Sequence, residues 1–408
     1  MPSAAFTKAL EKINKDIPKI IADPRSISKK IILDSPRLNY VYGGAFTLGR
    51  IHRLIGPESG GKSTMCIYLA SQIQKHCPGH GICIYIDFER SFDVEHAKEN
   101  GLDVSADNFV YMKPDSLEDA DLAIEELIKT DEIGSIILDS ESMGVTRTII
   151  TDELGKANFG SYAKTLKDFL NRMNILCSNH DTTLFIISQE RAQMQMMSHA
   201  IQTTGGYALK YAASTMNRVK KIESLKEGSK EVGIHMNVRN YKNKTGIPWR
   251  ECDMDLHFKG GFDSTCEYVD LIKDLCADSR LAPLCTAGAG GTFKSEKFQF
   301  SIRGRDNMIA WAKKDHPGWE EIKKVINEII SGNNNMDENR VNPDEDDNVS
   351  DEMKEVLKAD KEAEEEHQPT TLEEVPIAKS KKKKADLDDT AGEPLATTED
   401  IPDIKMND

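Results

Sequence analysis

Gly56-Pro57-Glu58-Ser59-Gly60-Gly61-Lys62-Ser63 is the stretch that decides the fold of this chain. It fits the pattern G-x-x-x-x-G-K-[ST], in which a glycine-rich backbone wraps a polyphosphate and points its N–H groups inward. In such a loop Lys62 reaches the β- and γ-phosphates and the Ser63 hydroxyl binds Mg²⁺. The predicted nucleotide-binding residues are Gly56, Pro57, Glu58, Ser59, Gly60, Gly61, Lys62, Ser63 and Thr64.

The sequence on either side supplies the context that this loop needs. Residues 50–55 form a plausible short strand, and residues 62–70 are apolar and compatible with a helix. A helix that begins at the loop adds its positive end to the anion site. A turn in an unrelated loop is the alternative, and the flanking strand and helix disfavour it.

The bulk composition excludes several classes of protein. With 408 residues, the chain is long enough for two or three regions. No apolar run reaches the length of a membrane span, and the first residues lack the apolar centre of a signal peptide. Eight scattered cysteines, with no C-x-x-C pair, indicate reduced thiols instead of disulfides or metal ligands. These features predict a cytoplasmic protein with no membrane partner.

The net charge of −15 is concentrated at one end of the chain. Residues 337–408 hold 24 acidic and 10 basic residues, so the rest of the chain has a net charge of only −1. This segment has no aromatic residue and few aliphatic ones, which predicts disorder. The neutral body is compatible with nucleic-acid binding.

The central part of the chain alternates short apolar strands with helices. Residues 82–87, 135–139 and 183–188 are predicted to be buried strands, and residues 117–130 and 161–177 are predicted helices. This alternation predicts an α/β fold with a mostly parallel central sheet covered on both faces. Ligands of such sheets bind at the carboxyl ends of the strands.

We predict four regions along the chain. Residues 1–35 form an amino-terminal oligomerisation segment, with a short amphipathic helix at 5–13 that docks on its own body or on a neighbouring subunit. Residues 36–260 form the nucleotide-binding core. Residues 261–335 form a small α+β subdomain, with helices expected at 268–275 and 319–330, and residues 336–408 form a disordered acidic tail.

Three polar residues follow predicted strands at the edge where the phosphate loop lies. Asp139 follows an apolar strand and is placed to hold Mg²⁺. Glu89 is within reach to orient a water molecule on the γ-phosphate, and Gln189 is placed to sense that phosphate. Each residue alone would otherwise be a solvated strand end.

Residues 190–204 have no clear helical or strand period, and methionines lie among their polar residues. They form either a helix with a methionine face or a loop that becomes ordered on a ligand. A long loop beside a nucleotide sensor is usually functional.

Six blocks, in order along the chain, resemble the RecA-type DNA strand-exchange recombinases of bacteria and phages. The match covers residues 37–330. The blocks are Glu58-Ser59-Gly60-Gly61-Lys62-Ser63, Ile86-Asp87-Phe88-Glu89, Ile137-Leu138-Asp139-Ser140, Phe159-Gly160-Ser161-Tyr162-Ala163-Lys164, Thr203-Thr204-Gly205-Gly206-Tyr207-Ala208-Leu209-Lys210 and Tyr241-Lys242-Asn243-Lys244.

The resemblance implies roles for residues around the nucleotide, which would be ATP with Mg²⁺. Glu89 resembles the catalytic glutamate that activates water, and Gln189 resembles the γ-phosphate sensor. Asp93 and His96 lie where the family contacts and stacks on adenine. Lys242 and Lys244 match the paired lysines that reach the ATP of the adjacent subunit.

The resemblance also implies two DNA-binding loops. The first loop spans residues 150–159 and the second spans residues 190–204, with Phe159 and Met194 placed like the apolar residues that the family inserts between bases. The remaining DNA-contact candidates are Lys164, Arg172, Arg191, Gly205 and Gly206.

By this resemblance the chain forms helical filaments on single-stranded DNA, pairs it with double-stranded DNA and exchanges strands in an ATP-dependent reaction. Single-strand-binding and loader proteins would be further partners, and the protein would act at the nucleoid, or in a host cytoplasm if a phage encodes it. A ring-shaped helicase with the same phosphate loop is the main alternative, and a non-enzymatic ATP-binding scaffold is another.

Overall fold

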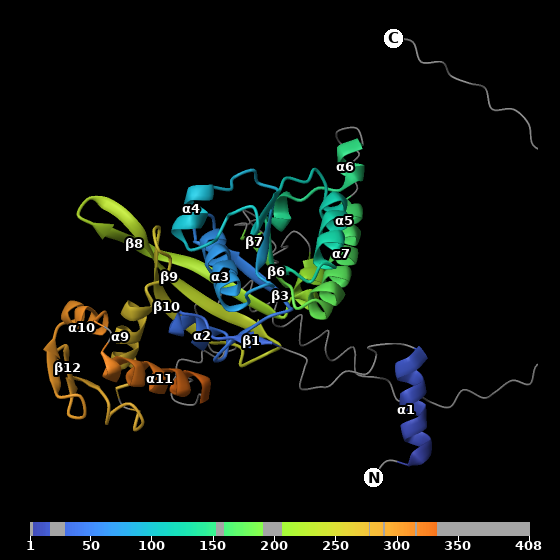
Figure 1. Cartoon of the computed structure of the whole chain (residues 1–408). Helices are drawn as coiled ribbons and strands as arrows, with labels where there is room; N and C mark the ends of the chain where they lie inside the picture. Colours follow the sequence, from blue (N-terminus) through green and yellow to red (C-terminus); the bar gives the residue numbers. More distant parts are fainter. Residues whose placement is uncertain are drawn as a thin grey trace, which may run out of the picture. The chain divides into compact units, whose positions relative to one another are not determined.

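The computed structural model describes residues 3–16, 29–151, 159–190, 206–276, 278–288, 290–314 and 316–332. Their main feature is an eight-stranded sheet with the strand order β10-β9-β8-β3-β7-β6-β4-β5 (Figure 1). Pairing is parallel from β8 to β5 and antiparallel between β8, β9 and β10. The strands are β3 Ile51–Gly56, β4 Ile82–Asp87, β5 Phe109–Met112, β6 Ile133–Asp139, β7 Thr183–Gln189, β8 Thr215–Glu227, β9 Lys230–Asn243 and β10 Glu251–His257.

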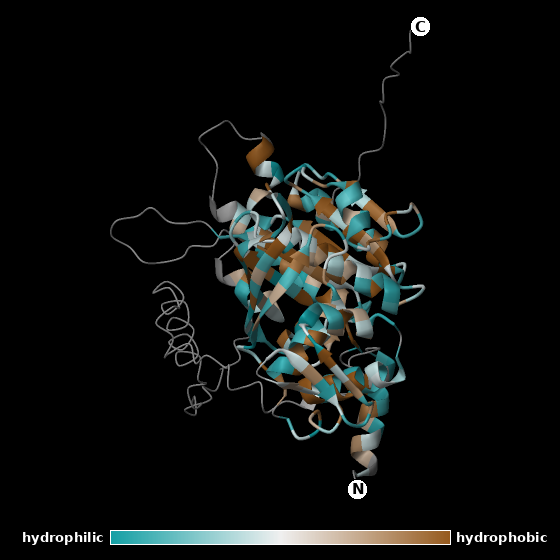
Figure 2. Ribbon diagram, turned by 90° about the vertical axis from the view of Figure 1, so that its left-hand side faces the viewer, coloured by the Kyte–Doolittle hydropathy of each residue, from teal (hydrophilic) through white to brown (hydrophobic). Residues whose placement is uncertain are grey.

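Helices cover the two faces of this sheet and form two apolar clusters. Side chains of α3 (Lys62–His76) pack on one face, and side chains of α5 (Leu117–Ile128) and α7 (Phe159–Asn179) pack on the other. The strands β3, β4, β6 and β7 are buried almost throughout because they are covered on both sides. In Figure 2 the apolar stretches of ribbon gather in the interior, and polar stretches lie at the peripheral turns. The expected α/β fold with a mostly parallel sheet is confirmed.

Five further described elements comprise one helix before the first strand and four short elements between strands. They are α1 Ala4–Asp16, α4 Val94–Glu99, η2 Glu141–Met143, α6 Arg147–Thr151 and α8 Gly206–Ala212. The helix α1 contains the predicted helix 5–13, and most of its side chains that are described are exposed. The amphipathic pattern places Phe6, Leu10 and Ile13 on one side of this helix.

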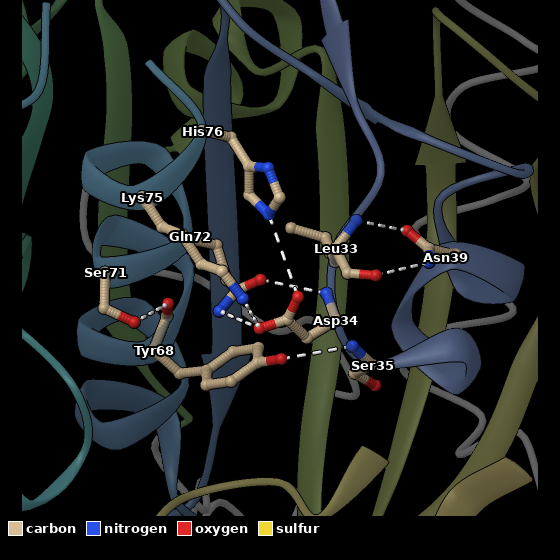
Figure 3. A network of polar contacts seen from close by, with 9 residues as sticks. All are labelled: Leu33, Asp34, Ser35, Asn39, Tyr68, Ser71, Gln72, Lys75 and His76. Atoms are coloured by element: carbon tan, nitrogen blue, oxygen red, sulfur yellow. Dashed lines mark hydrogen bonds and ion pairs between the residues drawn. The ribbon is translucent and has the colours of Figure 1, made fainter. Parts of the chain in front are cut away.

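The chain that precedes β3 is part of the packed body. β1 (Lys30–Ile31) pairs with β2 (Phe46–Thr47), and α2 (Pro36–Val41) lies between them in sequence. Asp34 binds Lys75 at 2.6 Å and lies 3.8 Å from His76 at the end of α3 (Figure 3). Asn39 binds the backbone of Leu33 through both ends of its amide. Residues 30–35, which the sequence analysis assigned to the amino-terminal segment, are therefore held on the core.

The described residues of the carboxyl-terminal region form three helices and a small sheet. Its elements are α9 Ser264–Asp274, β11 Thr286–Gly288, β12 Thr292–Ser295, β13 Phe300–Arg303, α10 Arg305–Ala312 and α11 Pro317–Gly332. Its buried side chains, such as Val269 and Ile326, belong to the same apolar cluster as α2 and α3. The expected boundary at residue 260 follows the end of β10 but does not interrupt the hydrophobic core.

Within the residues described, no helix combines the length and the apolar character needed to cross a membrane. The predicted acidic tail, residues 336–408, lies outside the described residues.

Candidate nucleotide and DNA site

The phosphate loop connects the end of β3 to the start of α3 at the carboxyl edge of the sheet. A Cβ atom on Gly56 would lie 2.0 Å from the carbonyl oxygen of Val219, so this position requires glycine. Gly61 has a φ of +89° immediately before Lys62, the first residue of α3. Lys62 folds back over the loop, where its Nζ donates to the carbonyl oxygen of Pro57 at 2.6 Å. The loop therefore brings the amino terminus of α3 and the Lys62 side chain close together, as in an anion-binding site.

Two hard oxygen ligands meet beside the loop. The Ser63 hydroxyl donates to Asp139 Oδ2 at 2.7 Å, and the Tyr85 hydroxyl donates to the same oxygen at 2.6 Å. Burial raises the pKa of Asp139, and its two hydrogen bonds oppose that shift. Burial also lowers the pKa of Lys62, which the neighbouring carboxylates of Asp139 and Glu89 counteract. A hydroxyl and a carboxylate are the ligand types that Mg²⁺ prefers.

Glu89 accepts hydrogen bonds from residues at the ends of two other strands. Its Oε1 accepts a hydrogen bond from Ser140 Oγ at 2.5 Å and another from Gln189 Nε2 at 2.7 Å. Ser140 follows Asp139 through a cis peptide bond and also lies 2.9 Å from Ser142, oxygen to oxygen. The three strand ends β4, β6 and β7 thus bring together the predicted water-activating residue, the magnesium ligand and the phosphate sensor.

The predicted adenine contacts lie on α4, beside the first turn of α3. Asp93 caps α4 by accepting from the backbone N–H groups of Glu95 and His96. The ring of His96 lies 3.0 Å from the Thr64 hydroxyl, measured from Nε2 to Oγ1. His96 is therefore close to the residue that follows Ser63, and Asp93 fixes the start of the helix that carries His96.

Phe258, which no sequence motif indicates, has its backbone next to this group. Asn100 donates to the carbonyl oxygens of both His96 and Phe258, at 2.8 and 3.3 Å. The N–H of Gly260 donates to Glu99 at 2.8 Å, which holds the chain after β10 against α4. Asn100 thus joins the backbone of Phe258 to the backbone of His96, and Phe258 is 38% exposed. The sequence signal at this position is weak: an aromatic residue lies between the polar residues His257 and Lys259.

Lys242 and Lys244 lie at the opposite edge of the sheet. Thr215 pairs with His52 of β3 and with Asn243 of β9, so the two lysines lie near the start of β3. Gly56 is the fourth residue after His52 on β3, which corresponds to about 13 Å of extended strand. Both ammonium groups donate to carbonyl oxygens at the end of α8: Lys242 to Lys210, and Lys244 to Tyr211 at 2.8 Å. The lysines are therefore directed away from the phosphate loop of their own subunit.

The described DNA candidates lie on α7 and at the start of α8. Phe159 begins α7, Lys164 is exposed one turn further on, and Gly206 begins α8. Arg172 lies about 20 Å along α7 from Phe159 and pairs with Asp121 at 3.2 Å and Glu125 at 2.5 Å. The structure thus does not bring Arg172 to the end of the helix where Phe159 lies.

Arg191, Met194 and Gly205 lie outside the described residues, as does most of the second predicted loop. The first residue of this loop is fixed: the Glu190 N–H donates to the Gly56 carbonyl oxygen at 3.0 Å, and its carboxylate pairs with Arg218. The stretch 191–205 therefore connects the carboxyl edge, where Gln189 ends β7, to α8, whose carbonyls hold the two lysines.

The chain resembles known proteins across this whole region. The family model for the RecA N-terminal domain matches residues 8–263. The protein named Protein RecA from Helicobacter pylori (strain ATCC 700392 / 26695) is 30% identical over 292 residues, which cover 71% of this chain and 80% of the relative. Protein RecA from Prochlorococcus marinus (strain NATL1A) is 27% identical over 307 residues, covering 75% and 78% respectively. A nucleotide-binding loop, an acidic strand-end cluster and these relatives together lead to one conclusion: the chain belongs to the RecA family of ATP-dependent DNA recombinases.

Proposed function

We propose that this protein hydrolyses ATP with Mg²⁺ at the carboxyl edge of the sheet and uses that reaction to control a filament on single-stranded DNA. The observation that carries the proposal is the Glu89 cluster, in which Oε1 accepts from both Ser140 and Gln189. A water-orienting carboxylate and a phosphate sensor in direct contact can link hydrolysis to a change elsewhere.

The residues of the loop fit a magnesium nucleotide. The glycine positions leave room only for backbone, the start of α3 offers N–H groups, and Ser63 and Asp139 supply oxygen ligands. Bound ATP supplies the γ-phosphoryl group and, with Mg²⁺, the charge that these residues neutralise. Lys62 binds the phosphates, Ser63 and Asp139 hold the metal ion, and Asp93, His96 and Phe258 hold the base.

Glu89 orients the attacking water and accepts its proton. Gln189 hydrogen-bonds the γ-phosphate and, as the last residue of β7, moves the start of the DNA loop that follows Glu190. Loss of the γ-phosphate lets Gln189 return to Glu89, its partner in this structure. Nucleotide state is thereby linked to DNA binding by residues 191–205.

The ATP site is completed by a neighbouring subunit. Lys242 and Lys244 lie about 13 Å of strand away from the phosphate loop edge, so they serve the ATP of the next subunit. Such a head-to-tail contact repeats without closing and builds a helical filament. In that filament Phe159 and Met194 separate bases, while Lys164, Arg191, Gly205 and Gly206 contact the phosphate backbone.

The filament pairs its single strand with double-stranded DNA and exchanges strands, and base pairing alone reads the sequence. Single-strand-binding and loader proteins are further proposed partners, and the proposed location is the cytoplasm, at the nucleoid or in a phage-infected host. The eight cysteines are free thiols within the described part of the chain, as a reducing compartment requires.

A strand-exchange assay with circular single-stranded and linear double-stranded DNA tests the proposal, together with electron microscopy in the presence of an ATP analogue. Joint molecules and open helical filaments are expected. Closed rings without joint molecules would instead assign the chain to the ring helicases. Absence of DNA-stimulated ATP hydrolysis would indicate a non-enzymatic scaffold.

A further inference from the structure

A buried ion pair lies behind the catalytic groups. Arg53 occupies the centre of β3, between Ile51 and Ile55, which both belong to the apolar cluster under α5 and α7. Its Nη2 lies 3.4 Å from Glu141 Oε1, and both side chains are only 2% exposed. Burying two charges costs several kcal/mol per ion, and well-packed apolar residues of similar volume are often at least as stable. The stability of the fold alone is therefore a weak explanation for the presence of this buried ion pair.

The pair contacts the segments that carry the catalytic residues. Arg53 Nε donates to Ser188 Oγ at 2.8 Å, and Ser188 immediately precedes Gln189. Glu141 is two residues after Asp139, in the turn that contains Ser140, the partner of Glu89. Arg53 itself lies three residues before Gly56 on β3. One guanidinium thus fixes β3, β7 and the turn after β6 relative to one another.

A further contact extends this group to the DNA side of the molecule. The carbonyl oxygen of Glu141 accepts a hydrogen bond from the Tyr162 hydroxyl. Tyr162 belongs to the first turn of α7, which begins at Phe159. A displacement of the start of α7 therefore acts directly on the backbone of Glu141, and through the ion pair on Ser188 and β3.

We propose that Arg53 and Glu141 are positioning residues that keep Gln189 and Ser140 in register with Glu89 and transmit DNA binding at the start of α7 to ATP hydrolysis. This inference rests on the proposed function. Both side chains are buried, so neither is placed as a direct ligand of nucleotide or DNA. Arginine suits the task because its rigid fork reaches Ser188 through Nε and Glu141 through Nη2, whereas a lysine has a single ammonium group.

The decisive variant removes both charges together. Arg53→Met/Glu141→Leu fills the site with apolar side chains, so the protein should fold without an uncompensated buried charge. We expect its KM for ATP and its affinity for single-stranded DNA to stay within about twofold of the wild type. Its DNA-stimulated kcat should fall at least about tenfold, because small misplacements of catalytic groups have effects of this size.

Two milder variants keep the test independent of folding. Ser188→Ala removes one contact of Arg53, and Tyr162→Phe removes the hydrogen bond to the Glu141 carbonyl. Ser188→Ala should lower kcat with and without DNA. Tyr162→Phe should lower only the stimulation by DNA. Arg305→Met is the matched control, since Arg305 forms a two-point ion pair with Asp270 far from the site in sequence and should change stability alone.

The outcomes separate this inference from the proposed function. A wild-type protein without DNA-stimulated hydrolysis would remove the proposed function itself. An active wild type together with a folded double variant of unchanged kcat and unchanged DNA stimulation would overturn the positioning role. Loss of DNA stimulation in Tyr162→Phe, with normal thermal stability, would support it even if the double variant fails to fold. Unchanged kcat in Ser188→Ala together with full stimulation by DNA in Tyr162→Phe would overturn it.

Discussion

Gly56 has room for a hydrogen atom and nothing larger. Replacing it by alanine would place a Cβ 2.0 Å from the Val219 carbonyl oxygen, a backbone atom of the neighbouring strand β8. Since backbone must move, we expect Gly56→Ala to lower the free energy of unfolding by at least about 3 kcal/mol. Urea denaturation followed by circular dichroism measures this loss.

Gly290→Ala is the control for that measurement. Gly290 has no atom within 4 Å of an added Cβ and no positive φ. We expect a change of no more than about 0.5 kcal/mol. Equal losses in the two variants would show that close approach of β8 is not what restricts position 56.

Substitutions of Lys62 and of Lys242 are expected to impair different steps, nucleotide binding and ATP hydrolysis. Lys62 lies in the phosphate loop of its own subunit, so Lys62→Ala should abolish nucleotide binding and all ATP-dependent activity. Lys242 lies at the other edge of the sheet, so Lys242→Ala should leave nucleotide affinity unchanged and lower DNA-stimulated hydrolysis at least about tenfold.

Binding of a fluorescent ATP analogue and steady-state hydrolysis distinguish the two variants. Mixing Lys62→Ala with Lys242→Ala subunits should restore part of the hydrolysis, because the intact Lys242 of one serves the intact phosphate loop of the other. Equal loss of nucleotide affinity in both variants would contradict the assignment of Lys242 to a neighbouring subunit.

At this scale the residues of short motifs could be predicted from sequence. The residue spacing within 56–63 is typical of a phosphate-binding loop, and Asp139 and Glu89 follow apolar runs that predict strands. Tyr85 and Phe258 could not, since an aromatic residue in a strand or after one is ordinary until folding places it beside Asp139 or Asn100. Arg53 in an apolar strand likewise has no distinctive sequence signal.

Among the elements, α2 and α9 are joined by a buried carboxylate. Glu267 on α9 accepts from the Ser35 hydroxyl at 2.6 Å and from the N–H of Arg37 at 3.3 Å, at the start of α2. Burial raises the pKa of Glu267 to about 7. The unfolded chain therefore loses this proton at lower pH than the folded chain does, and stability falls as pH rises from about 4.5 to about 7.

Glu267→Gln should remove this pH dependence while keeping an oxygen that accepts both hydrogen bonds. Relative to the wild type, the variant should gain about 3 kcal/mol in unfolding free energy between pH 4.5 and pH 8. Urea denaturation of both proteins across this range measures the difference. Glu296→Gln, at an exposed position, is the control, and a constant difference between wild type and Glu267→Gln would rule out the titration of Glu267.

The helix α1 is expected to act between subunits. Phe6 is 55% exposed and Ile13 is 41% exposed, on one side of a 13-residue helix that would be marginal alone. Phe6→Asp should leave nucleotide binding and thermal stability unchanged and weaken filament formation at least about tenfold. Light scattering on single-stranded DNA measures assembly, and Lys12→Ala on the same helix is the control. Normal assembly by Phe6→Asp would remove α1 from the interface.

Strands with continuous apolar runs could be predicted from the sequence. Strands that are covered by neighbouring elements over only part of their length could not. The strands β4, β6 and β7 have continuous apolar runs, because both faces are covered, and the predicted ranges match them closely. The long antiparallel strands β8 and β9 mix charged and apolar residues because their distal halves are exposed. Nothing local distinguishes such a pattern from a loop.

For the whole molecule, charge separation gives a prediction about DNA loading. Residues 337–408 have 24 acidic and 10 basic residues, whereas the rest of the chain is almost neutral. This segment should compete with DNA for the body electrostatically, so truncation after Asn335 should speed loading at low salt. The gain should shrink as salt rises, because screening shortens electrostatic range. Stopped-flow loading at two ionic strengths tests this, and equal rates for both proteins at low salt would reject it.

The way in which the elements pack together in the whole molecule could be predicted least from the sequence. The change of pattern near residue 260 marks the end of the sheet, yet Val269 and Ile326 share their core with α2 and α3. Periodicity shows that a helix has an apolar side but not which element covers it. The body therefore includes more of the chain than composition alone indicates.

The contacts of Lys242 and Lys244 with α8 have one more consequence, for the ends of the proposed filament. At one end the terminal subunit keeps its lysines on the carbonyl oxygens of Lys210 and Tyr211, since no nucleotide is offered to them. At the other end the terminal subunit holds a nucleotide that no incoming lysine completes. The two ends then differ chemically, so growth and shortening should proceed at different rates and the polymer should have a direction along its DNA.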